Sequence, residues 1–482
     1  MSASHIGTDP IDSTHLPAPL EEFANSIDWL PAADTDKYRL DPRDRFVGKS
    51  APVFLPRSTK EVSELVALCH RHQINIVPYG GGTGVVAGQL VFKAENTIII
   101  SLEKMNAVRS VCAEDSVLIA EAGCILAHIQ EIAAEIGMIF PLSMASEGSS
   151  TIGGNLATNC GGIQVLRYGN ARDLCLGIEA VLPDGSILHE LTPLRKNNTG
   201  YDLRHLLIGS EGTLGIITAA SLSLKPTDAE TLTAFCSVNS PASAVKLLST
   251  MRSALGDTVS AFELMCDYGF TLLEYHFPEQ RFPLETRSEW YVLMEVGGTE
   301  GLEVRFQAAL EDALETELIS DAVVASSQAQ RNALWRLRED TPEANRLSGA
   351  ICNSDTSVPL SEIQMFIEST YEAISDIDPT LTINCYGHVG DGNIHFNVFP
   401  PPGRNKAEIV KNDQALLDSL RNAINQNTLN YNGSISAEHG IGRLKQKDLS
   451  QLGNPAKLSL IKTIKQAIDP KGIMNPGVIV SQ

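Results

Sequence analysis

The chain has 482 residues, which is too long for a single hydrophobic core and predicts two or three domains. Hydrophobic residues make up 43% of it and the formal net charge is −21, so we expect a globular protein whose surface repels nucleic acid and anionic membranes. Its nine cysteines include no C-x-x-C pair, which excludes the usual spacing of an iron–sulfur cluster or a thiolate zinc site and fits reduced thiols in the cytosol.

The first elements can be read in chain order. Residues 1–47 are polar, contain prolines and are weakly periodic, so we expect an extended lead-in. It shows no signal peptide, and no apolar run in the chain approaches the ~18 residues of a membrane span, which favours a cytoplasmic protein. Ser58 to Glu61 form a capping-box pattern that predicts a helix through His70. Strands are expected at 75–78, 97–102 and 117–122, and a helix at about 124–136.

A glycine-rich loop, PYGGGTGVVAGQ, follows the first of these strands. Residues 82–87 satisfy G-x-G-x-x-[GA] and Glu103 lies at a suitable distance downstream, which taken alone suggests an NAD site. A Rossmann turn must open a helix, however, and the sequence after Gly84 has a strand pattern without a helical stripe. We therefore expect a loop between two strands whose backbone N–H groups can hold a phosphate. For this stretch alone, the alternative is a flexible surface loop.

Two further glycine-rich segments follow, EGSSTIGGNLATNCGG at 147–162 and IGSEGTLGII at 208–217. Apolar strands and helices flank each segment, so linkers are a poor explanation. Small residues let the backbone approach a large flat ligand, and Asn155, Thr158, Asn159 and Ser210 can form hydrogen bonds with it.

In this order, the three segments and the following Lys225-Pro226 resemble the FAD-binding domain of the vanillyl-alcohol oxidase/p-cresol methylhydroxylase flavoproteins, over about residues 48–227. The resemblance implies a two-part α+β FAD-binding domain, with Gly80–Gly84 on the pyrophosphate and the 148–162 stretch along the cofactor. The first loop has no histidine for covalent attachment, so we expect non-covalent FAD. The residues that the resemblance assigns to FAD are Pro78, Gly80, Gly81, Gly82, Thr83, Gly84, Gly148, Thr151, Ile152, Gly153, Asn155, Thr158, Asn159, Gly161, Gly162, Gly212, Ile217 and Asn475.

Beyond residue 228, strands alternate with amphipathic helices. Strands are expected in LTAFCSV, AFELM and YVLMEV, and helices at about 241–255, 301–315, 404–427 and 455–468. This pattern predicts an α+β substrate domain with a mainly antiparallel sheet. The expected organisation is a lead-in (1–47), an FAD-binding domain (48–227), a substrate and metal domain (228–440) and a C-terminal helical segment that returns to the FAD domain (441–482).

A predicted hairpin carries two histidines. LTINCYGH and NIHFNVF read as strands around a Gly-Asp-Gly turn. If the turn is centred between Asp391 and Gly392, His388 and His395 face each other with Cβ atoms about 4.5–5.5 Å apart, close enough to share a metal. Asn397 points to the same face. The alternative is a pair of histidines that pack in the core or face solvent.

A third ligand is available in SISAEHGIG. Two imidazoles and the carboxylate of Glu438 would leave open coordination positions, as catalytic metal sites do. Adjacent side chains cannot easily bind one ion together, which leaves His439 for proton transfer. The alternative is an exposed Glu-His pair in a loop.

GHVGDGNIHFNV and SISAEHGIG are similar to the D-2-hydroxyacid dehydrogenase branch of the same flavoproteins, most nearly to its hydroxyglutarate enzymes. The similarity implies that His388, His395 and Glu438 bind zinc or manganese and that His439 is the general base. Arg338, in LWRLREDTPEA, matches the arginine that binds the substrate carboxylate, a role that suits a guanidinium fork. Its alternative is a surface helix arginine.

Two positions depart from the hydroxyglutarate pattern. Asn353 stands where those enzymes have a lysine, and their threonine appears as Pro342 with Thr341 beside it. The expected substrate-binding residues are thus Arg338, Thr341, Asn353 and Asn397. We expect an FAD- and metal-dependent dehydrogenase that oxidises a D-2-hydroxy acid such as D-2-hydroxyglutarate to the 2-oxo acid.

The expected partners are that small acid and a separate electron acceptor, such as an electron-transfer flavoprotein or a quinone-linked carrier. The candidate assembly is a homodimer. The alternatives are a D-lactate or glycolate dehydrogenase, a metal-dependent hydrolase, and a non-catalytic flavin-binding subunit.

Overall fold

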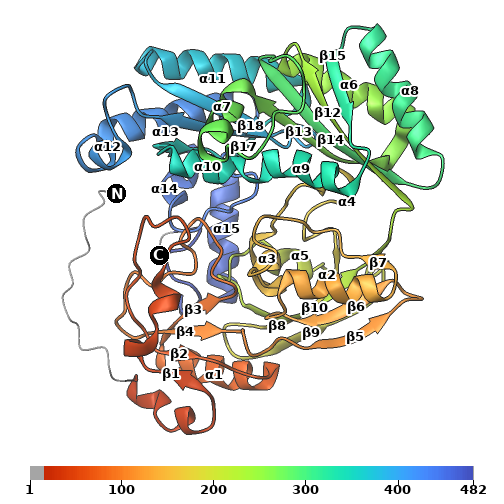
Figure 1. Ribbon diagram of the computed structural model, residues 1–482. Coiled ribbons are helices and arrows are strands. Elements are labelled where there is room, and N and C mark those ends of the chain that lie inside the picture. The colour runs from red at the N-terminus through yellow and green to blue at the C-terminus, as the bar shows by residue number, and fades with distance from the viewer. Residues whose placement is uncertain (1–15, 481–482) are drawn as a thin grey trace. The chain divides into compact units, whose positions relative to one another are not determined.

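The computed structural model describes residues 16–480, which divide into two compact units (Figure 1). Unit 1 contains residues 163–168 and 228–437, and unit 2 contains residues 16–162, 169–227 and 438–480. The protein is mixed α/β, as the sequence predicts, and most of its strand pairs are antiparallel.

Unit 2 begins with an alternation of short strands and helices and ends with two helices. Its elements are β1 (Trp29–Leu30), β2 (Val53–Phe54), α1 (Thr59–His72), β3 (Asn75–Tyr79), β4 (Thr97–Ser101), β5 (Val108–Cys112), β6 (Val117–Glu121), α2 (Leu126–Glu135), β7 (Met138–Ile139), α3 (Ile152–Thr158), β8 (Cys175–Val181), β9 (Ile187–Glu190), α5 (Arg204–Leu207), β10 (Ile216–Ser223), β11 (Lys225–Pro226), α14 (Gln446–Leu452) and α15 (Pro455–Ile468).

Two main sheets organise unit 2. One has the order β1-β2-β4-β3, in which β2, β4 and β3 are parallel. The other is antiparallel, with the order β5-β6-β10-β8-β9. No helix lies between β3 and β4, so the glycine-rich loop joins strand to strand and the exclusion of a Rossmann turn is confirmed.

Helix α1 forms as its local sequence predicts. The Ser58 side chain caps it by accepting a hydrogen bond from the Glu61 backbone N–H at 3.2 Å. Its apolar stripe, including Val62, Leu65 and Val66, is fully buried against β3 and β4. The capping signal and the periodicity agree, which is why this prediction is correct.

The described part of the lead-in, residues 16–47, is not simply extended. It contains β1 and several short 3-10 helices, and it buries Leu20 and Tyr38. The Tyr38 ring packs edge-on against Tyr79 of β3, with centroids 4.8 Å apart. Its apolar residues are too widely spaced to create a periodic pattern, yet Leu20, Ile27 and Tyr38 belong to the hydrophobic clusters that cover the parallel sheet.

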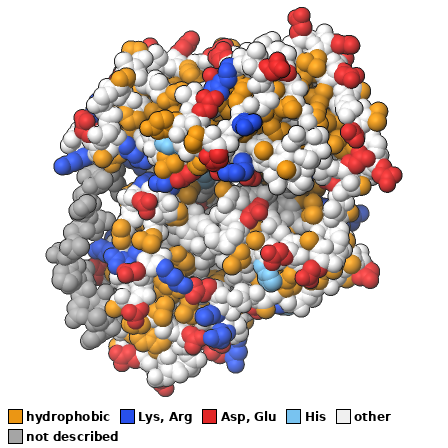
Figure 2. Space-filling view, in the orientation of Figure 1, with side chains coloured by type: hydrophobic (Ala, Val, Ile, Leu, Met, Phe, Trp, Pro, Cys, Tyr) orange, Lys and Arg blue, Asp and Glu red, His pale blue; other side chains and the backbone are white. Residues whose placement is uncertain are grey.

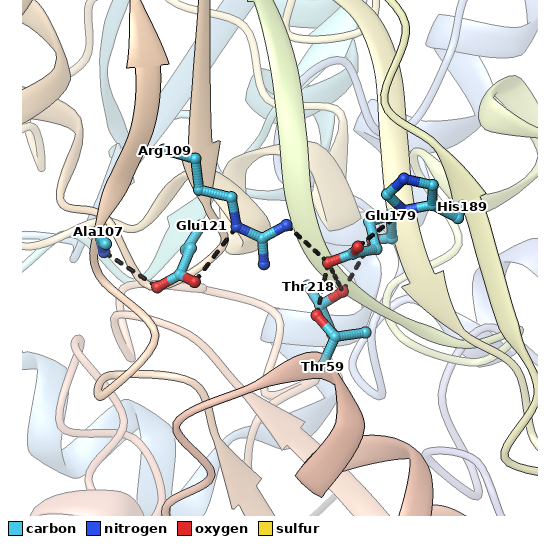
Figure 3. Close-up of polar contacts among 7 residues, drawn as sticks. All are labelled: Thr59, Ala107, Arg109, Glu121, Glu179, His189 and Thr218. Atoms are coloured by element: carbon cyan, nitrogen blue, oxygen red, sulfur yellow. Dashed lines mark hydrogen bonds and ion pairs between the residues drawn. The ribbon is translucent and has the colours of Figure 1, made fainter.

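A buried carboxylate links α1 to the antiparallel sheet of unit 2. Glu179 of β8 accepts hydrogen bonds from the Thr59 hydroxyl at 2.5 Å and from Arg109 of β5 at 3.0 Å. It also contacts the Thr218 hydroxyl at 3.2 Å and His189 Nδ1 at 2.9 Å (Figure 3). Every oxygen of this carboxylate is therefore bound, so a charge that is costly to bury is compensated.

Unit 1 contains one large antiparallel sheet with the strand order β15-β12-β14-β13-β18-β19-β16, in which β17 also pairs with β19. Its elements are α4 (Val165–Tyr168), β12 (Glu230–Val238), α6 (Pro241–Leu255), β13 (Val259–Cys266), α7 (Asp267–His276), β14 (Trp290–Gly298), α8 (Leu302–Glu315), β15 (Ile319–Val324), α9 (Gln328–Glu339), α10 (Thr341–Leu347), β16 (Cys352–Asn353), β17 (Thr356–Ser357), α11 (Ile363–Ile377), β18 (Thr382–Gly387), β19 (Asn393–Phe399), α12 (Lys406–Asn412) and α13 (Gln414–Asn430).

Helices cover both faces of this sheet. Helices α6, α8, α11 and α13 bury one face, and α7, α9 and α10 bury the other (Figure 1). Along β13, Phe262 and Leu264 point to the first face, whereas Met265 points to the second. Because side chains alternate along a strand, Glu263 also points toward α9.

The helix expected at 404–427 is two helices rather than one. The chain breaks between α12 and α13 at Asp413, whose backbone is not helical and whose side chain accepts a hydrogen bond from Leu416 N at 3.2 Å. Asp413 therefore ends one helix and caps the next.

Figure 2 shows how charged side chains are distributed on one face of the molecule. On the face in Figure 2, acidic side chains are scattered among basic and apolar ones instead of forming one patch. Among residues 16–480, no helix is both long enough and apolar enough to cross a lipid bilayer.

Candidate active site

The three glycine-rich segments of unit 2 meet. A Cβ at Gly80 would lie 2.8 Å from the Thr151 hydroxyl, and one at Gly81 would collide with the backbone carbonyl of Ser149. A Cβ at Gly212 would lie 2.9 Å from Pro78. These contacts require glycine, because any side chain would separate the segments. The structure thus brings together the three segments that the sequence assigns to one ligand.

The middle segment contains the short helix α3. Ile152, Gly153 and Asn155 are buried in it, and Asn159 ends it in the left-handed conformation with φ 49°. The Thr158 hydroxyl donates to the Gly154 carbonyl at 3.1 Å. Of the other residues assigned to FAD, Gly82 (φ 74°), Thr83 and Gly84 lie in the first loop, Gly148, Gly161 and Gly162 flank α3, and Ile217 lies in β10.

The donor set of these segments fits a flavin nucleotide. The Thr151 hydroxyl is buried and has no hydrogen-bond partner among residues 16–480. A buried hydroxyl without a partner is costly, so a polar ligand group at this position would stabilise it. A Cβ at Gly148 would meet nothing within 4 Å, which leaves room beside the same segment.

The C-terminal segment joins these loops. The backbone N–H of Asn475 donates to Ile76 O of β3, and its side-chain amide donates to Glu211 O, both at 2.8 Å. Asn475 has φ 43°, a conformation that asparagine tolerates better than most residues. Asn475 therefore holds the third glycine-rich segment against β3.

In unit 1, the predicted hairpin is present but its expected register is wrong. Tyr386 of β18, rather than His388, pairs with His395 of β19. His388 follows the end of β18 and belongs to a longer turn, in which the N–H groups of Asp391 and Asn393 both donate to its carbonyl. The two imidazoles still approach each other, with ring centroids 6.0 Å apart and ring nitrogens within 4.8 Å.

Both histidines are fixed in the tautomer that metal binding needs. Nδ1 of His388 lies 2.7 Å from a Glu263 carboxylate oxygen, and Nδ1 of His395 lies 3.1 Å from the Ser354 carbonyl. These oxygens can only accept, so each Nδ1 donates and each neutral ring carries its lone pair on Nε2. Metal-binding histidines are commonly oriented in this way, so the pair fits a divalent metal.

Glu263 is a residue of the site that sequence reasoning missed. It is fully buried, and its second oxygen accepts a hydrogen bond from Arg338 Nε at 2.7 Å. Burial opposes its ionisation, but the interactions with His388 and Arg338 prevail and lower its pKa to about 2. The only signal in the sequence was an acidic residue inside the apolar strand AFELM.

Arg338 is not an exposed helix residue. It is buried on the face of α9 that covers the sheet, and its guanidinium carbon lies 4.6 Å from the centre of the Tyr386 ring. Tyr386 in turn lies beside His395, with ring centroids 5.3 Å apart. Since Nε is bound to Glu263, the terminal nitrogens of Arg338 are the groups that can recognise a carboxylate.

Two asparagines extend the same surface. Asn353 and Asn397 are paired across β16 and β19, and the Asn353 amide donates to the Asn397 carbonyl oxygen at 2.5 Å. Thr341 is different, because it is buried and its hydroxyl donates to Leu337 O at 2.8 Å within the helical turn. Unit 1 thus places Asn353 beside Asn397, which follows His395 by two residues on β19, whereas the Thr341 hydroxyl already has a structural role.

Glu438 and His439 open the last segment of unit 2, directly after Ala437, the last residue of unit 1. The backbone N–H of Ala437 donates to Asp355 O at 3.2 Å within unit 1. The next turn is held within unit 2, where Glu211 accepts from the N–H groups of Ile441 and Gly442, both at 2.8 Å. The expected metal ligand Glu438 and the expected base His439 therefore lie where the chain passes from one unit to the other.

Comparison with known proteins agrees with these observations. Residues 50–190 match the FAD binding domain model, and residues 227–479 match the model described as FAD linked oxidases, C-terminal domain. The fold is similar to that of p-cresol methylhydroxylase, with a TM-score of 0.74 at 16% identity over 96% of each chain. It is also similar to alkyldihydroxyacetonephosphate synthase, with a TM-score of 0.72 at 19% identity over 99% of this chain and 87% of that one.

Curated relatives are more similar in sequence. A mitochondrial D-2-hydroxyglutarate dehydrogenase of Bos taurus is 38% identical over 92% of this chain and 80% of its own length. The enzyme of the same name from Arabidopsis thaliana is 36% identical over 92% of this chain and 78% of its own. A putative mitochondrial D-lactate dehydrogenase of Schizosaccharomyces pombe is 36% identical over 97% and 86%. The chain is therefore an FAD-dependent oxidoreductase of the FAD-linked oxidase family, in the branch of the D-2-hydroxyacid dehydrogenases.

Proposed function

We propose that this protein oxidises a D-2-hydroxy acid to the 2-oxo acid with the help of a divalent metal, and passes the electrons to a separate carrier. The observation that carries the proposal is the Glu263 carboxylate, which binds both His388 and Arg338 at 2.7 Å. One buried carboxylate thereby orients His388 as metal-binding histidines are oriented, and holds it beside Arg338, whose guanidinium can bind a substrate carboxylate. An α-hydroxy acid needs both functions within a few ångströms of each other.

The proposed metal ligands are His388, His395 and Glu438. The two histidines have the required tautomer, and the backbone bond of Ala437 to Asp355 tethers the residue before Glu438 to the unit that holds them. Two imidazoles and one carboxylate suit zinc or manganese and leave positions for substrate. When bound, such an ion would lower the pKa of the substrate hydroxyl.

His439 is the proposed general base, which takes the hydroxyl proton as the α-hydrogen leaves. A positioned base of this kind typically contributes ~10²–10⁴-fold in rate. Arg338 would hold the substrate carboxylate, while Asn353 and Asn397 would contact the rest of the substrate. Thr341 is the weakest candidate, because its hydroxyl already donates to Leu337 O.

FAD, when bound, would accept the hydride. We propose that it binds non-covalently along the three glycine-rich segments, whose first loop contains no histidine. The residues proposed to hold it are those that the sequence assigned, with the Thr151 hydroxyl as a polar contact. The proposed electron acceptor is an electron-transfer flavoprotein or a quinone-linked carrier. The expected cytoplasmic location stays a prediction, since several curated relatives are named as mitochondrial.

The substrate is proposed to be D-2-hydroxyglutarate or a monocarboxylate such as D-lactate. Asn353 favours the second candidate. Its amide is neutral and bound to Asn397, so it offers no cation to a second carboxylate. Among the curated relatives, a D-lactate dehydrogenase name occurs beside the hydroxyglutarate names.

Steady-state oxidation with an artificial electron acceptor tests this proposal. Purified protein would be assayed with D-2-hydroxyglutarate, D-lactate, D-malate and glycolate, with and without prior treatment by a chelator. We expect at least one D-2-hydroxy acid to be oxidised, with activity that the chelator removes and zinc or manganese restores. Activity that survives complete removal of metal would contradict the metal-assisted mechanism.

A further inference from the structure

Glu211, in the third glycine-rich segment, has a carboxylate that binds the backbone of the C-terminal segment. Its two oxygens accept hydrogen bonds from the N–H groups of Ile441 and Gly442, each at 2.8 Å, and the residue is 8% exposed. A Cβ at Gly440 would lie 2.8 Å from the same carboxylate. The turn that follows His439 is therefore wrapped around one acidic side chain.

This arrangement is energetically costly. Glu211 has φ 52°, a left-handed conformation that costs roughly 1–2 kcal/mol for a residue with a side chain. Glycine or asparagine would adopt it more easily. Burial also raises the pKa of the Glu211 carboxyl to about 6, even though both N–H groups and the more distant Lys445 favour the charged form. Strain and a buried charge in one residue indicate that the carboxylate itself is needed.

The backbone of Glu211 is held just as firmly. Its N–H donates to Ala157 O in α3, and its carbonyl accepts from the Asn475 amide, both at 2.8 Å. Helix α3 belongs to the segment proposed to lie along FAD. A single residue therefore connects the proposed cofactor segment to the turn that begins immediately after His439.

We propose that Glu211 is a positioning residue, whose carboxylate holds the 440–442 turn so that Glu438 and His439 are presented in their working orientation. The inference rests on the proposed function, because it concerns the residues assigned there as metal ligand and base. Glu211 acts through the backbone N–H groups of the two residues that follow Gly440. A displacement of a catalytic group by about 1 Å can cost ~10²-fold in rate. Loss of the two hydrogen bonds that anchor the turn should therefore slow the reaction substantially.

The test compares Glu211→Ala and Glu211→Gln in the FAD-loaded protein. Two quantities are measured: the rate of flavin reduction at saturating D-2-hydroxyglutarate or D-lactate, and backbone hydrogen exchange in residues 440–445. Glu211→Ala should speed the exchange and slow flavin reduction on the order of 10²-fold per bound FAD. KM should be nearly unchanged, since the proposed substrate arginine lies in unit 1. Glu211→Gln keeps one acceptor oxygen and should show a smaller loss.

Glu179→Gln provides the matched control. It removes another buried carboxylate of unit 2, but one that contacts Thr59 and Arg109 rather than the turn. It should destabilise the unit while leaving both quantities as in the parent protein. Unchanged exchange and unchanged reduction in Glu211→Ala would overturn the proposal, as would a loss of FAD with normal exchange. If neither D-2-hydroxyglutarate nor D-lactate reduces the flavin of the parent protein, the proposed function is contradicted. The hydrogen-exchange data would still decide whether Glu211 holds the turn.

Discussion

Replacing Glu263 with glutamine changes only one carboxylate oxygen to an NH₂ group, yet we expect it to disturb the site severely. The carboxylate is fully buried and accepts hydrogen bonds from Arg338 and His388 at 2.7 Å. Both partners are donors. A glutamine can accept from one of them, but its NH₂ group must then face the other donor. One of the two contacts is lost in either orientation.

The cost can be worked from this geometry. Arg338 is 6% exposed, so its charge would remain buried without the counter-charge that now compensates it. Removing one partner of a buried ion pair costs about 3–5 kcal/mol. Loss of the hydrogen bond that orients a metal-binding histidine typically weakens metal affinity by about 10–100-fold. Glu263→Gln should therefore lower both the stability of unit 1 and the affinity of the metal site.

Two assays separate these effects, namely urea denaturation and competition for zinc with a chelator. Glu295→Gln is the matched control, because Glu295 is a buried acid on the same face of the sheet that accepts from Arg331 Nε at 2.9 Å and Trp335 Nε1 at 2.7 Å. It should be destabilised but should keep its metal affinity. If Glu263→Gln retains zinc as tightly as Glu295→Gln does, the orienting role of Glu263 is refuted.

Four other outcomes are expected. Asn353→Lys should raise the ratio of kcat/KM for D-2-hydroxyglutarate over D-lactate by about 10-fold or more, and an unchanged ratio would mean that position 353 does not read the substrate. His395→Ala should lose its metal and recover partly with added metal, whereas His439→Ala should keep metal and FAD but reduce flavin ~10²–10⁴-fold more slowly, without rescue; the opposite pattern would exchange the two roles. Glu179→Gln should lower the free energy of unfolding by about 1–3 kcal/mol near neutral pH. Burial opposes ionisation of Glu179, but hydrogen bonds and the Arg109 guanidinium lower its pKa below the unfolded value. Its contribution to folding stability is therefore present above the unfolded pKa and is lost on acidification. A difference in urea midpoint between variant and parent that is equal at acid and neutral pH would contradict this. Burial raises the pKa of Glu211 from 4.5 to about 6, so the folded state binds this proton more tightly than the unfolded state. The free energy of unfolding should therefore fall by about 2 kcal/mol as the pH rises from 4.5 to above 6. Urea titrations of Glu211→Gln should lack that fall.

Local signals in the sequence predicted those elements whose formation is decided locally. Helix α1 has a capping serine and an apolar stripe that agree, and α6 and α15 begin and end where their periodicity does. The strand-to-strand glycine loop was also predictable, because no helical stripe follows it. Helix α3 was missed, since its seven residues are too short and too rich in glycine for a periodic signal.

The details that depend on distant parts of the chain could not be predicted. The hairpin turn is longer than Gly-Asp-Gly alone suggests, because Gly392 packs against the Val358 carbonyl and His388 becomes part of the turn. Alternation along β13 shows which face of the sheet the Glu263 side chain takes. It does not show that Arg338 and His388, which are 75 and 125 residues further along the chain, both bind Glu263 there. Such partners follow from the strand order, which local patterns do not encode.

Anaerobic mixing of the purified, metal-loaded protein with single enantiomers of 2-hydroxy acids tests the central claim most directly. The flavin absorbance would be followed in the absence of any other electron acceptor, and the 2-oxo acid would be quantified against bound FAD. We predict that a D-2-hydroxy acid, D-2-hydroxyglutarate or D-lactate, bleaches the flavin and yields stoichiometric 2-oxo acid, while the L enantiomer does not. A flavin that stays oxidised with every D-2-hydroxy acid tested would contradict the proposed reaction.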